Sequence, residues 1–148
     1  MYYKQQKDYT CGPSALRNAL SNLGLEYSEK YLANLLKTND RRGTWSYNFK
    51  KNIGKIPVTI LEKENVSLKE IKLLQKKGFQ VITCFYLQDE QVDHYTLIKE
   101  IIPGKIIFQD PWFGDDYEIS LEKFGKMWMV DSNYENRKKW IFAVKYDN

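Results

Sequence analysis

The sequence of 148 residues contains only one histidine and two cysteines. A metal site made from histidine and cysteine ligands needs several such side chains close together. His94 and the widely separated Cys11 and Cys84 therefore predict no metal centre and no cofactor. Two cysteines form at most one disulfide, which excludes the dense cysteine framework of small secreted domains. We expect a protein that works in the reducing cytoplasm.

The sequence also lacks a long apolar run. Residues 1–10 include no apolar segment of the kind that a signal peptide carries. The longest apolar stretches fall far short of the roughly 20 residues needed to cross a bilayer. We therefore expect neither a membrane span nor a secretion signal.

Charge of one sign does not dominate either. Lysine and arginine number 23 against 19 acidic residues, and they are scattered along the chain instead of being gathered in a block. The short basic runs 41–42 and 137–139 are typical of a solvated surface. The sequence therefore indicates no nucleic-acid partner.

Apolar residues are present in the amount that a core requires, since 43% of the chain is hydrophobic and 15% aromatic. A chain of this length buries enough apolar surface to fold without disulfides or metals. It shows no internal repeat, low-complexity tract or linker. Residues 1–148 are therefore expected to form one domain.

Helical periodicity dominates the first half of the chain. Between Cys11 and Leu23 apolar residues recur at three- and four-residue steps, and Gly24 follows as a stop signal. Pro13 lies near the first turn, where proline is tolerated. This pattern predicts a helix at 11–23, and similar patterns predict helices at 28–39, 47–52 and 67–78.

After Gly78 the pattern changes to β-branched and aromatic runs, with a turn signal at Pro103-Gly104. Helices followed by strands favour an α+β fold in which an N-terminal helical half packs against a C-terminal antiparallel β-sheet. Loop 38–44 is expected to be its most flexible segment. The predicted strands are 80–87, 94–98, 105–109, 117–120 and 139–144, with a helical turn at 121–127.

Cys11 stands where the first helix begins. Unpaired backbone N–H groups and the positive end of the helix dipole stabilise a thiolate at such a position. A cysteine before a helix is nonetheless more often buried and inert than reactive. Its function therefore depends on which residues lie beside it.

His94, the only histidine, precedes an apolar strand, and Asp110 ends the next strand. Pairing 94–98 with 105–109 across the Pro103-Gly104 turn brings the two side chains together. A carboxylate on Nδ1 of the imidazole would then fix its tautomer and support the imidazolium. These residues predict a Cys11–His94–Asp110 triad, although an aspartate before a proline can also simply start a turn.

Thiol hydrolysis also needs donors for a developing oxyanion, commonly a backbone N–H and a side-chain amide. Either Gln5 or Gln6 could place its amide beside the N–H of Cys11. Gly12 would let the backbone approach a substrate closely. Two further groups of residues have candidate roles. Trp112 and Phe113 could line a substrate groove, and Cys84, Trp128 and Trp140 are expected in the core.

The order and spacing of these motifs resemble the double-glycine leader peptidases, which process bacteriocin and peptide-pheromone precursors and belong to the papain-like clan. A glutamine lies six residues before the cysteine, and an Asp-Pro pair begins sixteen residues after the histidine. The matching residues are Gln5, then Cys11-Gly12-Pro13-Ser14-Ala15, His94-Tyr95-Thr96-Leu97-Ile98, Asp110-Pro111-Trp112-Phe113-Gly114, and finally Ser120, Phe124 and Trp128.

This resemblance implies a papain-like fold with the site between its two halves. It implies that Gln5 holds the oxyanion, Cys11 attacks, His94 carries the proton and Asp110 orients the imidazole. Relatives that process leaders are usually the front end of an ABC transporter, whereas this chain is similar to stand-alone members. The partners expected are a peptide or protein substrate and a separately encoded ABC transporter.

The function predicted is that of a cysteine peptidase acting through an acyl-enzyme, with a leader or precursor peptide cut after Gly-Gly as the candidate substrate. The same residues permit two alternatives. One is acyl transfer or amide hydrolysis through the same triad. The other is a peptidase-like module that binds a peptide in its cleft without cleaving it.

Overall fold

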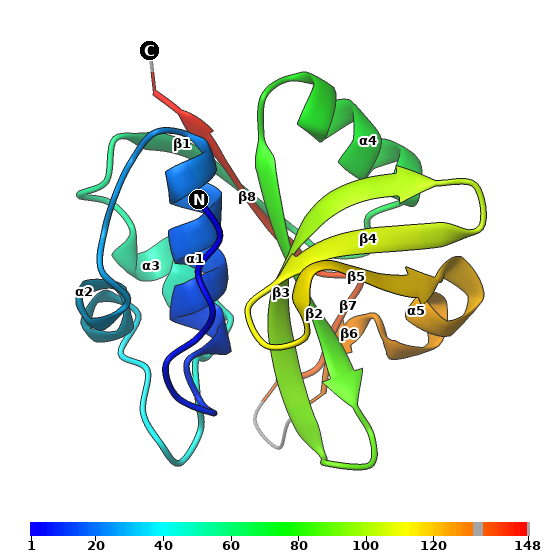
Figure 1. Ribbon diagram of the computed structural model, residues 1–148, viewed down its shortest axis with the longest axis horizontal. Coiled ribbons are helices and arrows are strands. Elements are labelled where there is room, and N and C mark those ends of the chain that lie inside the picture. The colour runs from blue at the N-terminus through cyan, green and yellow to red at the C-terminus, as the bar shows by residue number, and fades with distance from the viewer. Residues whose placement is uncertain (132–134, 148) are drawn as a thin grey trace.

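The computed structural model describes residues 1–131 and 135–147. Helix α1 (Cys11–Asn22) lies between α2 (Glu29–Leu35) and a six-stranded sheet (Figure 1). Nine of its twelve residues are buried, so it is a core element and not a surface helix. The other helices are α3 (Tyr47–Asn52), α4 (Leu68–Lys76) and α5 (Leu121–Met127).

The sheet is antiparallel throughout, with strand order β1-β8-β2-β3-β4-β5. A separate two-stranded ribbon joins β6 (Met129–Val130) to β7 (Arg137–Lys138). The predicted α+β class, with a helical half against an antiparallel sheet, is confirmed. The six strands are β1 (Val58–Lys63), β2 (Gln80–Leu87), β3 (Val92–Ile102), β4 (Lys105–Asp110), β5 (Gly114–Ser120) and β8 (Ile141–Tyr146).

Strand β1 is an element that the sequence reading missed, and it interrupts the predicted order of helices first and strands second. Its Val58-Thr59-Ile60 start is β-branched and follows Pro57, which is a usable strand signal. It pairs with the C-terminal strand β8 over its whole length. The N-terminal half therefore contributes one edge of the sheet.

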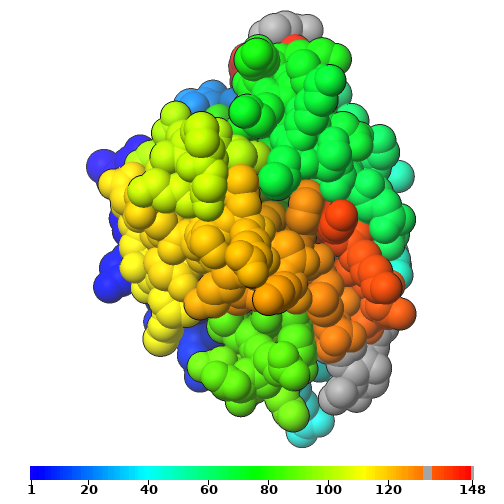
Figure 2. Space-filling view, turned by 90° about the vertical axis from the view of Figure 1, so that its right-hand side faces the viewer, coloured from blue at the N-terminus to red at the C-terminus, as the bar shows by residue number. Residues whose placement is uncertain are grey.

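Helices cover both faces of the sheet, not only one. Helices α1, α2 and α3 lie on one side, whereas α4 and α5 lie on the opposite face, which Figure 2 views directly. Helix α2 also ends earlier than the predicted Asn39, because Leu36 is its C-cap and Lys37 takes a positive φ of 55°. None of the helices in the described part of the chain combines the length and apolar character needed to cross a bilayer.

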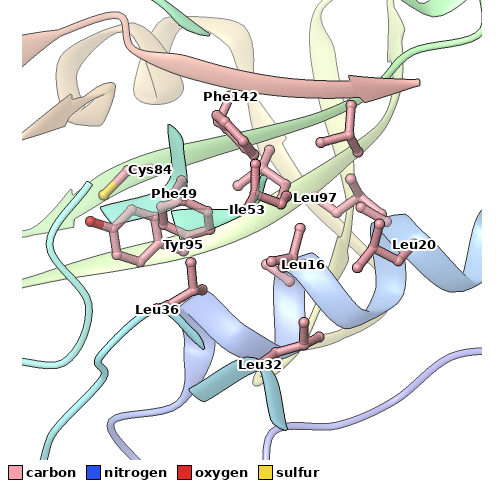
Figure 3. Close-up of a cluster of buried hydrophobic side chains, with 14 of the residues drawn as sticks. Leu16, Leu20, Leu32, Leu36, Phe49, Ile53, Cys84, Tyr95, Leu97 and Phe142 are labelled. Carbon is pink, nitrogen blue, oxygen red and sulfur yellow. The ribbon is translucent and has the colours of Figure 1, made fainter. Parts of the chain in front are cut away.

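Two apolar clusters fill the two sides of the sheet. Leu16 and Leu20 of α1 meet Phe142 of β8 in the cluster drawn in Figure 3. Alternation along β2 directs Cys84 to this cluster and Phe85 to the other one. The core positions predicted for Cys84, Trp128 and Trp140 are confirmed, since all three are buried.

An N-terminal strap, residues 2–6, joins the helices to the end of the sheet. On the helical side the buried Asn18 of α1 accepts a bond from the Tyr3 N–H at 2.7 Å and donates to the Tyr3 carbonyl at 2.9 Å. The backbone N–H of Gln6 donates to the Glu29 carboxylate of α2 at 3.1 Å. Both helices therefore hold the strap in place.

On the sheet side the same strap reaches the end of β4. The Tyr2 hydroxyl donates to the backbone carbonyl of Asp110. The Gln5 N–H donates to the carbonyl of Pro111 at 2.9 Å. The strap is therefore one polar link between the halves of the molecule.

A second polar link involves the segment that follows the ribbon turn. The buried Glu135 accepts bonds from the backbone and hydroxyl of Ser46, and Arg137 donates to that hydroxyl at 2.9 Å. Arg137 also pairs with Glu62 and Glu64 at 3.3 and 3.2 Å. The prediction that the basic run 137–139 is solvated is therefore wrong for Arg137, because two carboxylates compensate its buried charge.

Replacing Asn18 by alanine removes both bonds that hold the strap on α1 and leaves the backbone groups of Tyr3 without these partners. We expect the free energy of unfolding in urea to fall by about 1–3 kcal/mol. Asn34→Ala, on the exposed side of α2, is the matched control and should change stability by less than about 0.5 kcal/mol. Equal stability of the two variants would contradict the strap's anchoring role.

Candidate active site

Cys11 is the first residue of α1, with Thr10 as N-cap and the first helical bond running from the Ser14 N–H to the Thr10 carbonyl at 3.0 Å. The thiol is 9% exposed, which leaves it just accessible from a cleft. The unpaired N–H groups of the first turn surround it. This helix start therefore favours negative charge on the sulfur and on a bound oxyanion.

His94 and Asp110 are hydrogen-bonded to each other. The Nε2 atom of His94 lies 2.8 Å from Oδ2 and 3.0 Å from Oδ1 of Asp110, and both side chains are buried. The predicted contact of the carboxylate with Nδ1 is therefore wrong. Asp110 ends the neighbouring strand and occupies Nε2, which leaves Nδ1 as the ring nitrogen that can face Cys11.

The charges of this trio are mutually stabilised. Burial alone lowers the pKa of His94, but hydrogen bonds with Asp110 and Cys11 outweigh it and raise that pKa to about 10. Burial likewise raises the pKa of Asp110, yet its bonds with His94 and with the Phe113 backbone lower it overall. The imidazolium and the carboxylate are therefore the stable forms near neutral pH.

The chain after Asp110 folds back on its own carboxylate. Oδ1 accepts the backbone N–H groups of Trp112 at 2.9 Å and Phe113 at 2.7 Å. The Phe113 ring then packs edge-on against the imidazole of His94, with centroids 5.4 Å apart. The expected turn after Asp110 and its contact with His94 thus occur together, because Oδ1 accepts the turn's N–H groups while Oδ2 makes the shorter contact with the imidazole.

Gln5 lies on the strap beside the turn that leads into α1. Its Nε2 donates to the Lys7 carbonyl at 2.7 Å, and the same carbonyl accepts from the Thr10 hydroxyl at 2.9 Å. Gln6 is exposed, and its backbone is held by Glu29. Of the two glutamines considered, Gln5 is the one whose side chain is tied to the residue before Cys11.

Gly12 packs against loop 40–45. A Cβ atom at this position would lie 2.6 Å from Oγ1 and 2.9 Å from Cβ of Thr44. The absence of a side chain therefore allows α1 to begin directly against this loop. The cleft lining includes Cys11 and Thr44, while Gly12 lies behind them.

A cleft of about 660 Å³ opens at Cys11 and His94. One wall is loop 40–45, and the other is the turn between β2 and β3 with the first residues of β3, 90–95. Loop 40–45, which had no assigned role in the sequence, belongs to a tight turn: Asn39 bridges to Gly43 and its side chain accepts two backbone N–H groups. Only Asn39 and Gly43 gave a turn signal there.

Trp112 and Phe113 are outside the lining of this cleft. They are 53% and 42% exposed, and they adjoin His94 through the turn after Asp110. They therefore form an exposed aromatic pair next to the imidazole. The described residues contain no group of three side chains of the kind that could hold a metal ion.

A family model described as the peptidase C39 family matches residues 1–131. The chain belongs to this family. Its members are cysteine peptidases, and so is this protein. A relative from Methanothermobacter marburgensis, described as an uncharacterized protein, is 27% identical over 111 residues, covering 75% of this chain and 71% of its own.

Solved structures share the C39 fold. The peptidase domain of Streptococcus ComA, a bifunctional ABC transporter, superposes with a TM-score of 0.77 at 19% identity, covering 98% of this chain and 97% of that domain. A C39-like peptidase from Bacillus anthracis gives 0.74 at 14%, with 100% and 96% covered. A double glycine motif protease from an AMS/PCAT transporter, solved with its leader peptide, gives 0.72 at 17%, with 99% and 91% covered.

Adding a methyl group at Gly12 should displace the start of α1, because Thr44 is a branched side chain without room to move away. We expect Gly12→Ala to lower the free energy of unfolding by about 1–3 kcal/mol and to slow thiol labelling of Cys11. Gly125→Ala in α5 meets nothing within 4 Å and is the matched control, expected to be neutral or stabilising. Thr44→Ala should partly rescue the Gly12 variant, and a full loss without rescue would contradict this contact.

The raised pKa of His94 gives a prediction for alkylation by iodoacetamide. Since the imidazolium persists to about pH 10, its positive charge should speed alkylation of the Cys11 sulfur near neutrality. We expect His94→Gln to slow labelling at about pH 6 by about 10- to 100-fold. Above pH 10 the imidazole is neutral, so the rates of variant and parent should converge.

Mass spectrometry of the labelled peptide measures these rates. Cys84→Ala is the control and should label as the parent does, because Cys84 is buried and burial raises its pKa well above the ordinary value. Circular dichroism verifies that the His94 variant is folded. Equal labelling of parent and His94→Gln at about pH 6 would refute activation of the Cys11 sulfur by the imidazolium.

Proposed function

We propose that this C39 peptidase cleaves peptide bonds with Cys11 as nucleophile, His94 as acid and base, and Asp110 as the group that orients His94. The observation that carries the proposal is the position of the His94 ring, bonded through Nε2 to Asp110 and lining one cleft with Cys11 at the start of α1. A thiolate, a proton donor and a fixed carboxylate are thereby adjacent. This is the set that acyl-enzyme chemistry requires.

In the first half-reaction the Cys11 sulfur forms a bond with the scissile carbonyl carbon. The carbonyl π electrons move to oxygen, and the oxyanion is held by the backbone N–H of Cys11 and the side-chain amide of Gln5. The His94 imidazolium then gives its proton to the leaving nitrogen as the C–N bond breaks. The products are a free amine and a thioester on Cys11.

In the second half-reaction the now neutral His94 removes a proton from water, whose oxygen attacks the thioester carbonyl. Collapse of this second oxyanion breaks the C–S bond and releases a carboxylic acid. The proton remains on His94, and the thiolate–imidazolium pair is restored. Asp110 stays ionised throughout and stabilises the imidazolium through Nε2.

An extended peptide suits the cleft. Pairing between β3 and β4 begins at Leu97 opposite Gln109, so the first residues of β3 project beyond the end of β4. A strand that extends past its neighbour offers backbone groups to an incoming peptide. Loop 40–45 would form the opposite side, with Trp112 and Phe113 contacting the residues after the cleaved bond.

The natural substrate we propose is a leader or precursor peptide cut after Gly-Gly, supported by family membership and by the leader-bound relative. The partner proposed is an ABC transporter encoded separately, since the ComA and AMS/PCAT relatives are transporter peptidase domains. Residues 1–148 would act as one peptidase domain in the cytoplasm, where the two free cysteines stay reduced.

Incubation with a peptide library that contains Gly-Gly and matched Ala-Ala sequences tests the function. We expect cleavage after Gly-Gly, a covalent acyl-enzyme on Cys11 in intact-mass spectra, and loss of cleavage by at least about 10³-fold in Cys11→Ala. Cys84→Ala should cleave as the parent does. Cleavage that survives in Cys11→Ala would disprove the proposed nucleophile.

Two other results would redirect the assignment. Addition of glycine amide or hydroxylamine would produce adducts in place of acids if the acyl-enzyme reacts mainly with amines, which would indicate acyl transfer. Peptide binding with no acyl-enzyme at any pH would indicate a binding module. Cleavage after Ala-Ala at the same rate would refute the Gly-Gly preference while leaving the peptidase chemistry intact.

A further inference from the structure

Thr96 is a buried hydroxyl residue that the proposed mechanism does not use. Its side chain is fully inaccessible to solvent, and within the described ranges no group meets its oxygen with the geometry of a good hydrogen bond. A buried hydroxyl without a partner is costly. The residue opposite Thr96 on the neighbouring strand is therefore the candidate partner of this hydroxyl.

The register of the sheet places Thr96 directly opposite Asp110. Strands β3 and β4 pair Ile98 with Phe108 and Leu97 with Gln109, and one further step along the same register joins Thr96 to Asp110. Directly opposed side chains of an antiparallel pair have Cβ atoms about 4.5–5.5 Å apart. The threonine hydroxyl thus lies on the same face as the carboxylate and within its reach.

His94 occupies the diagonal position on the same face. It precedes Thr96 by two residues on β3, so both side chains point to one side of the strand. The imidazole of His94 and the hydroxyl of Thr96 therefore both face the carboxylate of Asp110. Its remaining contacts are the N–H groups of Trp112 and Phe113, both on Oδ1.

We propose that Thr96 is a positioning residue whose hydroxyl donates to the Asp110 carboxylate and so fixes the oxygen that holds His94. The carboxylate already accepts two backbone N–H groups on Oδ1 and contacts the imidazole of His94, and a further donor from β3 keeps it from turning about its own bond. Burial raises the pKa of Asp110, and the His94 bond, the Phe113 N–H and the Thr96 hydroxyl lower it. The inference rests on the proposed role of Asp110 and His94.

Other titratable groups face this pair from every side. The strap contributes the Tyr2 hydroxyl, α1 contributes Cys11, and β5 contributes Tyr117. Asp115 also raises the pKa of Tyr2, with a smaller effect than burial and Asp110, and Asp93 lies at the start of β3. All of these stay unchanged when only the Thr96 hydroxyl is removed, which makes Thr96→Val a clean comparison.

The test uses the fact that His94 is the only histidine. In protein labelled with ¹⁵N-histidine, the Nε2–H signal reports its bond to Asp110 without any substrate. We expect Thr96→Val to move the acid titration of this signal upward by about one pH unit, because the carboxylate loses a donor that favours its charged form. Thr96→Ser, which keeps the hydroxyl, should titrate as the parent does.

Activity provides the second measurement. Thr96→Val should lower kcat/KM by about 10-fold and shift the acid limb of its pH profile in the same direction, with Thr96→Ser within about 3-fold of the parent. Thr83→Val is the matched control. Thr83 pairs with Thr96 on β2, but its hydroxyl donates to the Trp140 carbonyl at 2.7 Å. Its removal should lower stability and leave both titrations unmoved.

An unchanged Nε2–H titration in folded Thr96→Val would overturn the proposal, even if activity fell, since a uniform loss would indicate packing alone. Thr96→Ser behaving like Thr96→Val would overturn it as well. Because the titration needs no substrate, these outcomes are independent of whether the protein cleaves peptides. A failed peptidase assay would instead count against the proposed function.

Discussion

The packing of α1 against β2 and β3 is the constraint on which the site depends. Cys11 is supplied by the helix and His94 by the strand, and neither element alone brings a sulfur near an imidazole. The strap and the Ser46–Glu135 link add polar contacts between the two halves. These contacts limit movement of one half against the other at the place where the proposed reaction needs the sulfur and the imidazole in fixed positions.

The proximity of Asp110 to His94 and the position of Cys11 at a helix start were accessible to sequence reasoning because each rested on a local signal. Cys11 follows from the periodicity and stop signal of one helix, and Asp110 from the strand that it ends. One turn at Pro103-Gly104 then sufficed to bring Asp110 beside His94, since an antiparallel hairpin has few registers. The fold class followed in the same way from helices preceding strands.

What sequence reasoning missed depends on tertiary contacts. Strand β1 joins the sheet only by pairing with β8, which lies more than seventy residues later in the chain. No local sequence pattern predicts that pairing. The use of Nε2 in place of Nδ1 follows from where the end of β4 meets the ring. Arg137 belongs to a basic run that suggests a surface position, yet its guanidinium pairs with Glu62 of β1 and with Glu64, which follows that strand.

The place of β8 in the sheet has a consequence during protein synthesis. This last strand lies between β1 and β2, so β1 joins the sheet only after residues 141–146 have left the ribosome. Contacts of such long sequence separation form late. The helical half is consequently fixed to the sheet through β1 only once β8 is in place, and a nascent chain carries Cys11 without the fully assembled site.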